Sequence, residues 1–298
     1  NNEYVDVVGW RIDEVVDLIR GESGTQVEIE FISSDSAENT RKLVTLVREE
    51  IKLEDRAAKS KIYEGADGNK IGIIDLPSFY IDFNAYQNRD SDYRSSSKDV
   101  KEILVGRNGL KSFLNKPSVV IDMSTICPIE TISMSKILSK TNTILIDAPV
   151  SGGEIGAIKG ELSIMIGGNK PTVKKLMPIF EILGNKITHV GESGSGQVAK
   201  ACNQIIVAQT INAVSEAFLI ADRFKVNKSK IRDALLGGFA NSKILEVHGD
   251  RMLKNSYAPG FKTKLHAKDL RIAHNIAIKK DLKLSGLNLV NKYMAICN

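Results

Sequence analysis

The stretch GSGQVAKACNQIIVAQTINAVSEAFLIADRF, from Gly194 to Phe224, decides the fold of the second half of this chain. After its glycines, about thirty residues follow without Pro or Gly, which is long enough for a helix of about eight turns. Its apolar residues leave almost no polar face. The pattern therefore predicts a buried central helix, around which an all-α domain is built.

Three polar residues, Lys200, Asn203 and Gln204, lie in the first turns of this predicted helix. Spacings of three and four residues place Asn203 and Gln204 beside Lys200 on one face. A Lys is rarely fully buried without a partner or a chemical role. The alternative is a Lys whose aliphatic stem packs on the helix while its ammonium reaches solvent, and spacing alone leaves both interpretations open.

Composition narrows the class of protein. The 298 residues, 42% of them hydrophobic, suffice for two ordinary domains. No charge-free run of 18 or more apolar residues and no signal-peptide pattern is present, so we expect a cytoplasmic protein without a membrane partner. The three cysteines and four histidines are too scattered for a disulfide framework or a metal site, so we expect no metal.

Charge is unevenly distributed along the chain. Residues 1–103 carry a net charge of −8 and residues 104–298 one of +13, which together give +5. Such a shift indicates two segments of different origin. The basic part lacks a Lys/Arg cluster with interleaved aromatics, so we expect no nucleic-acid partner; a small anionic molecule suits it better.

The acidic first third contains short predicted elements. A helix is expected at Asp13–Arg20, and strands are expected at Gln26–Ile32, Lys42–Arg48 and Lys70–Asp75, with a charged stretch at Glu49–Lys61. The segment with the sequence VVGWRIDEVVDLIRGESGTQVEIEFI resembles the second half of a PDZ domain of tail-specific, C-terminal-processing peptidases. IGIIDLPSFYIDFNAYQNRDSDYRSSSKDV resembles the start of their protease domain. The resemblance implies a strand-addition peptide groove, but no nucleophile turn is present, so we expect no protease activity.

Residues from Ser118 onward predict a parallel sheet. SVVIDM, Ser118–Met123, is an apolar run typical of a buried parallel strand, and Ser124-Thr125 follow at its carboxyl end, where open α/β sheets bind ligands. Further strands are expected at Thr143–Ile146, Glu161–Gly168 and Lys186–Val190, and helices at Glu130–Ser139 and Pro171–Leu183. The glycines of DAPVSGG, Asp147–Gly153, let backbone N–H groups approach an anion, although on this motif alone an ordinary turn is the commoner explanation.

These motifs, VVIDMSTICP, DAPVSGGEIGAIKGELSIMIGG, GSGQVAKACNQIIVA and PGFKTKLHAKDLRIA, resemble the β-hydroxyacid dehydrogenase family in order and spacing. Gln204 and the Leu265-His266 pair lean towards its 2-hydroxy-3-oxopropionate (tartronate semialdehyde) reductase branch. The resemblance implies reduction of a small semialdehyde carboxylate by NAD or NADP. It also implies a homo-oligomer that assembles through the helical domain.

The resemblance also implies site residues. Lys200 would be the catalytic acid–base, with its proton made easier to lose by burial. Substrate would be bound by Ser151, Gly152, Gly153, Asn203, Gln204 and Phe261. The cofactor would contact Thr125 and Lys268. Without the resemblance, Lys268 reads as a solvated helix lysine.

One departure from the family is large. No Gly-x-Gly-x-x-Gly turn precedes Ser118, and Gly106 and Gly109 are not it, so we expect very low cofactor affinity and an impaired or inactive enzyme. The alternatives are a PDZ-type peptide-binding fragment or a non-functional chimera, joined within Ser96–Gly106.

The predicted architecture is α/β: an α+β PDZ/peptidase fragment, then a truncated Rossmann-type sheet, then an all-α domain on a long central helix. The expected boundaries are 1–32 (PDZ half), 33–103 (peptidase start), 104–192 (Rossmann part) and 193–298 (helical substrate and dimerisation domain).

Overall fold

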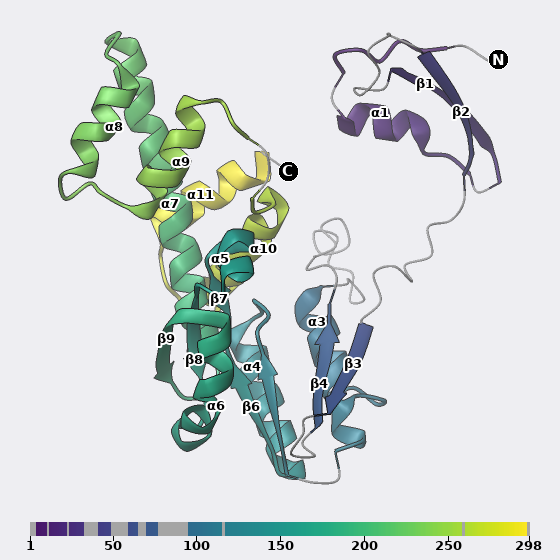
Figure 1. Ribbon diagram of the computed structural model, residues 1–298, viewed down its shortest axis with the longest axis vertical. Coiled ribbons are helices and arrows are strands. Elements are labelled where there is room, and N and C mark those ends of the chain that lie inside the picture. The colour runs from purple at the N-terminus through teal and green to yellow at the C-terminus, as the bar shows by residue number, and fades with distance from the viewer. Residues whose placement is uncertain are drawn as a thin grey trace. The chain divides into compact units, whose positions relative to one another are not determined.

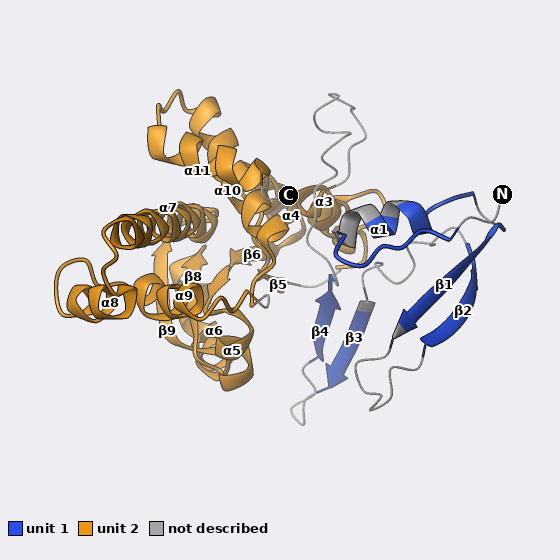
Figure 2. Ribbon diagram, turned by 90° about the horizontal axis from the view of Figure 1, so that it is seen from above, with its two compact units in different colours: residues 1–77 blue, residues 78–298 orange. Residues whose placement is uncertain are grey.

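The computed structural model divides the chain into two compact units, Asn1–Pro77 and Ser78–Asn298 (Figure 2). The structure describes residues 4–10, 12–22, 24–32, 41–48, 59–64, 70–76, 95–114, 117–257 and 260–296.

The described residues of the first unit form one helix and two antiparallel hairpins (Figure 1). The helix is α1 (Ile12–Ile19); the hairpins are β1 (Gln26–Ile32) with β2 (Arg41–Val47), and β3 (Lys59–Glu64) with β4 (Lys70–Asp75). The three strands and the helix predicted in this part are therefore confirmed to within a residue or two. β3 is an addition, because its sequence was read only as a charged stretch and its apolar residues are few.

The described side chains of the first unit form no buried core. β2 and β4 are exposed along their whole lengths, and every fully buried residue that the structure describes lies at or beyond Ser95. An isolated two-stranded hairpin is marginally stable in water, because it buries little apolar surface. The assignment of this unit to a PDZ domain and a peptidase stays a prediction.

The second unit begins its described part with α3 (Ser96–Val105), which packs against α4 (Pro128–Leu138). Ser95 caps α3 by accepting a hydrogen bond from the backbone N–H of Lys98, and Val100 and Leu104 are buried. The predicted boundary at residue 104 cuts through this helix. The structure corrects it, because α3 packs with the elements that follow it.

A five-stranded mixed sheet forms the lower part of this unit in Figure 1. Its strands are β5 (Ser118–Asp122), β6 (Thr143–Asp147), β7 (Val150–Ser151), β8 (Leu162–Gly167) and β9 (Gly184–Gly191). β5 and β6 are parallel; β8 runs antiparallel to β6 and β7 and parallel to β9. α6 (Lys170–Leu183) covers β8 and β9, and its Phe180 is fully buried. The short helix α5 (Gly153–Lys159) follows β7.

The prediction that Ser118–Met123 is a buried parallel strand is half right. β5 is parallel to β6, but Asp122 is its one buried side chain and Val119 is 44% exposed. Within the described residues β5 pairs only with β6 and ends the sheet order. An edge strand keeps water on one side, so the apolar run does not imply full burial here.

The helical part is built on α7 (Ser195–Arg223), as expected, and four further helices are described in it. These are α8 (Lys228–Leu236), α9 (Lys243–Leu253), α10 (Thr263–Lys279) and α11 (Ser285–Ile296). α10 and α11 pack on α7 around a small-residue core that includes Ala201, Ala208 and Leu270. α9 packs on the later part of α7 around Phe218 and Leu245.

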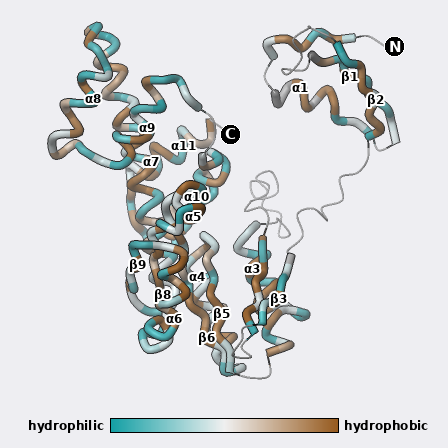
Figure 3. The backbone as a smooth tube through the Cα atoms, viewed as in Figure 1, coloured by the Kyte–Doolittle hydropathy of each residue, from teal (hydrophilic) through white to brown (hydrophobic). Residues whose placement is uncertain are grey.

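α7 is less buried than its sequence predicts. Its first turns contact β8 and β9, but Ile206, Leu219 and Ile220 are each more than 60% exposed, and apolar stretches mark its length in Figure 3. By length and composition α7 is the one described helix that could cross a membrane. Its buried Gln197 and Gln204 hydrogen-bond to the loop after β5 and to α10, and its buried Lys200 hydrogen-bonds to Gln204. We therefore interpret it as the core helix of this domain.

Candidate active site

The start of α7 is held by a carboxylate at the end of a strand. Asp147, the last residue of β6, is fully buried and accepts hydrogen bonds from the backbone N–H groups of Gly194 (2.7 Å) and Gln197 (3.0 Å). Helix N-termini leave such donors unsatisfied and favour negative charge. Burial raises the pKa of Asp147, and these hydrogen bonds oppose the rise. Asp147 thus fixes where α7 begins relative to the sheet.

Gln197 ties the same helix to the loop after β5. Its Oε1 accepts from the N–H of Ile126 (3.0 Å) and its Nε2 donates to the carbonyl of Ser124 (2.7 Å). The side chain is 1% exposed, so both amide groups are used inside the protein. The loop that carries Thr125 is therefore fixed on both sides of that residue.

Lys200, Asn203 and Gln204 meet as their spacing predicts. Lys200 Nζ donates to Gln204 Oε1 (3.1 Å), and Asn203 Nδ2 donates to the same oxygen (2.8 Å). Lys200 is 7% exposed, which excludes the alternative of an ammonium that reaches solvent. Burial lowers the pKa of Lys200, Asp269 acts to raise it and Lys268 to lower it further. A buried ammonium with a lowered pKa is suited to donating a proton.

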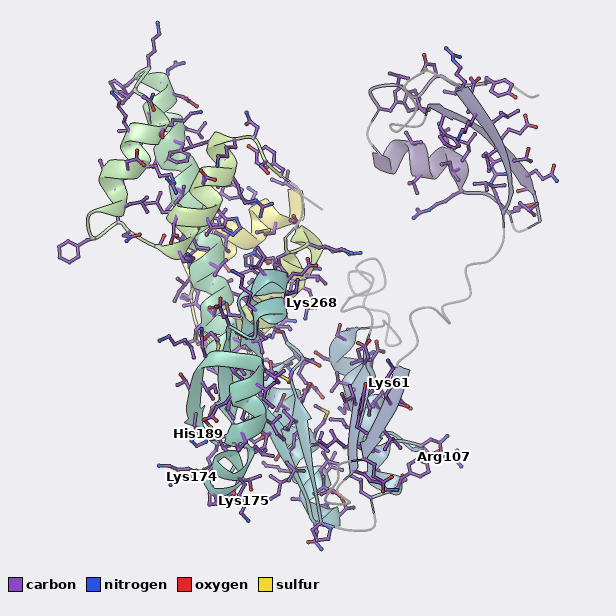
Figure 4. The ribbon with its side chains drawn as sticks, in the orientation of Figure 1. Lys61, Arg107, Lys174, Lys175, His189 and Lys268 are labelled. Atoms are coloured by element: carbon purple, nitrogen blue, oxygen red, sulfur yellow. The ribbon has the colours of Figure 1, made fainter. Side chains whose placement is uncertain are left out.

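α10 supplies the opposite wall of this site. Gln204 Nε2 donates to Asp269 Oδ2 at 2.6 Å. Lys268, labelled in Figure 4, donates through Nζ to the carbonyl of Thr125 (2.7 Å) and lies 2.9 Å from Asp269 Oδ1. Lys268 is 6% exposed, so the interpretation as a solvated helix lysine is wrong. The two residues predicted to contact the cofactor, Thr125 and Lys268, therefore lie together.

The imidazole of His266 lies beside Gln204 and completes this cluster of polar side chains. His266 is buried, and its Nε2 lies 3.2 Å from the backbone carbonyl of Gln204, which requires a proton on that nitrogen. Burial lowers the pKa of His266, so the ring is neutral at pH 7. Phe261, 49% exposed, packs against it at a centroid distance of 5.9 Å. Phe261 thus joins the site through His266.

The turn Ser151–Gly153 stands apart from this hydrogen-bonded group. Ser151 pairs with Ser163 of β8, and Gly152 and Gly153 have φ angles of 138° and 64°, which other residues rarely adopt. Both glycines are exposed at the start of α5. Among the described residues, no hydrogen bond links this turn to Lys200. Its role as the carboxylate-binding turn stays a prediction.

A second buried carboxyl, Asp122, lies at the end of β5, in register with Asp147. Its Oδ1 accepts from the N–H of Ser124, whereas its Oδ2 is buried without a hydrogen-bond partner. Burial raises the pKa of Asp122 to about 6, and Asp147 adds to the rise while Lys268 opposes it. The carboxyl ends of β5 and β6 thus concentrate ionisable groups beside the loop that carries Thr125.

The described residues fit only part of a dinucleotide. Thr125 and Lys268 provide polar groups at the carboxyl ends of the strands, where such ligands bind in open α/β sheets. The two glycines before β5 are used otherwise: Gly106 ends α3 with its N–H bonded to Glu102 O, and Gly109 precedes a short turn at Leu110–Ser112. No strand–glycine–helix cradle for a pyrophosphate occurs before β5 in the part of the chain that the structure describes.

Family comparisons match the whole of this region. Residues 95–191 match the family model described as the NAD binding domain of 6-phosphogluconate dehydrogenase. Residues 194–298 match the model described as NAD-binding of NADP-dependent 3-hydroxyisobutyrate dehydrogenase. Residues 95–298 belong to the β-hydroxyacid dehydrogenase family. This family uses NAD or NADP, in agreement with the expected cofactor class.

Individual relatives agree with the family. The chain is 48% identical to 2-hydroxy-3-oxopropionate reductase of Escherichia coli (strain K12) over 64% of each sequence. It is 39% identical to the 3-hydroxyisobutyrate dehydrogenase-like 1 protein of Arabidopsis thaliana, over 65% of this chain and 58% of that protein. A solved 3-hydroxyisobutyrate dehydrogenase of Mycobacterium tuberculosis with L-serine superposes with a TM-score of 0.56 and 29% identity, over 59% of this chain and 63% of that one. The chain thus spans less than two thirds of the length of these relatives.

Sequence reasoning missed the residues that hold the predicted ones. Gln197, His266 and Asp269 each contact a predicted site residue or its loop, and Asp147 holds the first turn of the helix that carries Lys200. Two of them carried a signal in the sequence, since Asp147 ends an apolar strand and Asp269 follows Lys268 directly. His266 stood out only through the resemblance, as part of the Leu265-His266 pair, and Gln197 carried no signal.

Proposed function

We propose that residues 95–298 carry the substrate side of an NAD(P)-dependent reductase that converts a small semialdehyde carboxylate, such as 2-hydroxy-3-oxopropionate, into its hydroxyacid. One observation carries the proposal: the ammonium of Lys200 is buried, with Gln204 as its one hydrogen-bond acceptor within the described residues. The likeness to the Escherichia coli reductase supports the substrate class.

Lys200 would act at the carbonyl oxygen of the substrate. An ammonium has three donors and Gln204 uses one, so a donor remains for a substrate oxygen. A bound NADH or NADPH would supply a hydride to the carbonyl carbon. Lys200 donates a proton to the carbonyl oxygen, becomes neutral and is reprotonated from water. Ser151, Gly152 and Gly153 would bind the substrate carboxylate.

Asn203, Gln204 and Phe261 would have different tasks around the substrate. The Gln204 amide oxygen accepts from Lys200 and Asn203, and its Nε2 donates to Asp269, so this residue shapes the site from within. Asn203 is only partly buried and can orient the substrate directly. Phe261 would line the entrance.

The decisive experiment follows oxidation of NADH and NADPH by the purified full chain with 2-hydroxy-3-oxopropionate, with glycerate identified by mass spectrometry. We expect slow, substrate-dependent turnover, because the described residues before β5 form no pyrophosphate cradle. Lys200→Met should lower it by roughly 10²–10⁴-fold, the usual contribution of a general acid. Lys243→Met is the matched control, because the Lys243 side chain on α9 is exposed. An unchanged rate in Lys200→Met would refute the assignment.

Cofactor and peptide titrations separate the alternatives. Fluorescence titration with NADH or NADPH should show no tight binding; micromolar affinity would mean that the cofactor cradle is supplied in another way. Binding of a C-terminal peptide to the full chain, with no turnover, would favour the PDZ-type reading of residues 1–32. Absence of substrate, cofactor and peptide binding together would favour a non-functional chimera.

A homo-oligomer through the helical part is a further element of the proposal. The exposed apolar side chains of α7, among them Ile206 and Ile220, support it, because such surface is usually covered in an assembly. Light scattering coupled to gel filtration should give a mass above 32.7 kDa. Ile206→Glu should return it to the monomer value.

A further inference from the structure

Asp269 is a buried carboxylate to which none of the proposed catalytic steps assigns a task. It is 4% exposed and lies on α10, beside Lys268 in sequence. A buried carboxylate persists only where donors or cations compensate for its lost hydration. The groups that contact Asp269 therefore indicate its role.

The hydrogen bond of Asp269 is directed at one side chain. Within the described part of the chain, Gln204 Nε2 is the one hydrogen-bond donor to this carboxylate, at 2.6 Å. Oδ1 lies 2.9 Å from Lys268 Nζ, close enough for an ion pair, but it is not aligned for a hydrogen bond. Lys268 instead donates to the Thr125 carbonyl. Asp269 thus accepts its hydrogen bond from the Gln204 side chain and not from the backbone of a helix end or a turn.

This bond decides which way the Gln204 amide faces. A carboxylate can only accept and an ammonium can only donate, so an amide between Asp269 and Lys200 has one satisfactory orientation. Its Nε2 must face Asp269 and its Oε1 must face Lys200, as the distances of 2.6 and 3.1 Å show. The reverse orientation would set donor against donor and acceptor against acceptor.

Asp269 is also a negative charge that acts on Lys200 among several ionisable groups. Lys200 on α7 and Lys268 on α10 are both buried, and the charge of Lys268 disfavours the charged form of Lys200. His266 on the same face of α10 is neutral, and Asp122 on β5 interacts with Lys268. The carboxylate of Asp269 therefore supports the charged form of Lys200 against burial and against Lys268.

We propose that Asp269 is a positioning residue for Lys200: through the Gln204 amide it fixes the acceptor that orients the Lys200 ammonium, and its charge keeps that ammonium protonated until the substrate takes the proton. The inference rests on the proposed role of Lys200 as the proton donor. It does not depend on how well the chain binds its cofactor.

The test measures the titration of Lys200 in the full chain by NMR of ¹³C,¹⁵N-labelled lysine side chains, with Lys200 assigned as the signal lost in Lys200→Arg. In Asp269→Asn, whose folding is checked by circular dichroism, the pKa of Lys200 should fall by about one unit or more, because a nearby opposite charge is removed. Asp250→Asn on α9, which removes the carboxylate that pairs with Lys254, should leave the pKa of Lys200 unchanged.

An unchanged Lys200 titration in folded Asp269→Asn would overturn the proposal and leave Asp269 a structural brace. A brace would alter only the unfolding midpoint. If the chain turns over substrate, the alkaline limb of its pH–rate profile should move down by the same amount in this variant. That profile moves only if Asp269 acts on the proton donor, so failure of the reductase assignment and failure of this inference give different results.

A second measurement needs no variant at Asp269. The side-chain NH₂ of Gln204, assigned by triple-resonance NMR of the wild-type chain, should exchange with solvent far more slowly than that of exposed Gln26 on β1. Slow exchange supports the bond to the carboxylate. Exchange as fast as that of Gln26 would show that the amide is not held and would contradict the proposal.

Discussion

At the scale of single residues, polar side chains with fully used hydrogen bonds fix the candidate site. Gln197 joins α7 to the loop after β5, and Asp147 holds the first turn of the same helix. Neither touches the proposed substrate. Both determine whether Lys200 and Thr125 keep their relative positions. Replacing either residue should therefore lower the stability of the fold and also shift the site residues.

Gln197→Leu should destabilise the second unit by about 2–4 kcal/mol, because it leaves the buried N–H of Ile126 and the carbonyl of Ser124 without partners. Urea unfolding followed by far-ultraviolet circular dichroism measures the change. Glu216→Leu, at an exposed position of α7, is the control and should change stability by less than about 0.5 kcal/mol. Equal effects of the two would show that Gln197 is not bridging.

Asp122 should make stability depend on pH. Its pKa is raised from 3.8 to about 6 in the folded chain, so folding favours the protonated form. Ionised Asp122 therefore lowers the free energy of unfolding. This loss is absent below about pH 3.8, grows as pH rises towards the folded-state pKa of about 6, and reaches at most about 3 kcal/mol above it. The stability difference between Asp122→Asn and wild type should therefore grow between about pH 4 and pH 6. A difference that stays flat across this range would mean that Asp122 titrates normally.

At the scale of elements, glycines show where backbones approach closely. A Cβ on Gly196, at the start of α7, would lie 2.4 Å from the Met165 carbonyl and 2.8 Å from that of Asp147. A Cβ on Gly249, within α9, would have nothing nearer than 3.5 Å. The first glycine is required by the contact between α7 and the sheet, and the second is not.

The same substitution should thus have opposite effects at the two positions. Gly249→Ala should stabilise the chain by up to about 1 kcal/mol, since Ala is the better helix former. Gly196→Ala should destabilise it by more than that gain, because two backbone carbonyls would have to move. Thermal unfolding of both variants beside the wild type measures the signs. A stable Gly196→Ala variant would contradict the close packing of α7 on β6 and β8.

Some elements could be predicted from the sequence and others could not. The long helix, the order of the strands and helices, and the Lys200–Asn203–Gln204 face all follow from periodicity and spacing, which are local properties. The additional strand β3, the exposed edge of β5 and the exposed side of α7 do not, because they depend on which neighbour an element has. Asp269 and His266 were missed for the same reason: their partner, Gln204, lies more than sixty residues away.

At the scale of the whole molecule, the two units differ in what holds them together. The second has contiguous buried clusters in its sheet and helical parts, whereas the first has no buried described side chain. The single tryptophan, Trp10, lies in the first unit and is 47% exposed. Tryptophan fluorescence therefore reports one unit, while circular dichroism is dominated by the other.

Unfolding of the chain should not be two-state. Trp10 emission should lie close to that of indole in water and change little with urea, while the ellipticity shows a cooperative transition from the second unit. Coincident transitions would mean that residues 1–77 fold together with the rest. Trp10→Phe, with unchanged ellipticity in urea, is the control that the reporter itself contributes no stability.

The bond between Lys268 and Thr125 has a consequence for the order of events during folding. It joins residues 143 positions apart, while the Gln204–Asp269 bond spans 65. Contacts across such separations form only after the intervening chain has been organised, because closing a long loop costs entropy before any contact repays it. The helix and its lysine are therefore made early and the site is assembled late. Substitutions in the site should accelerate unfolding and leave the refolding rate nearly unchanged.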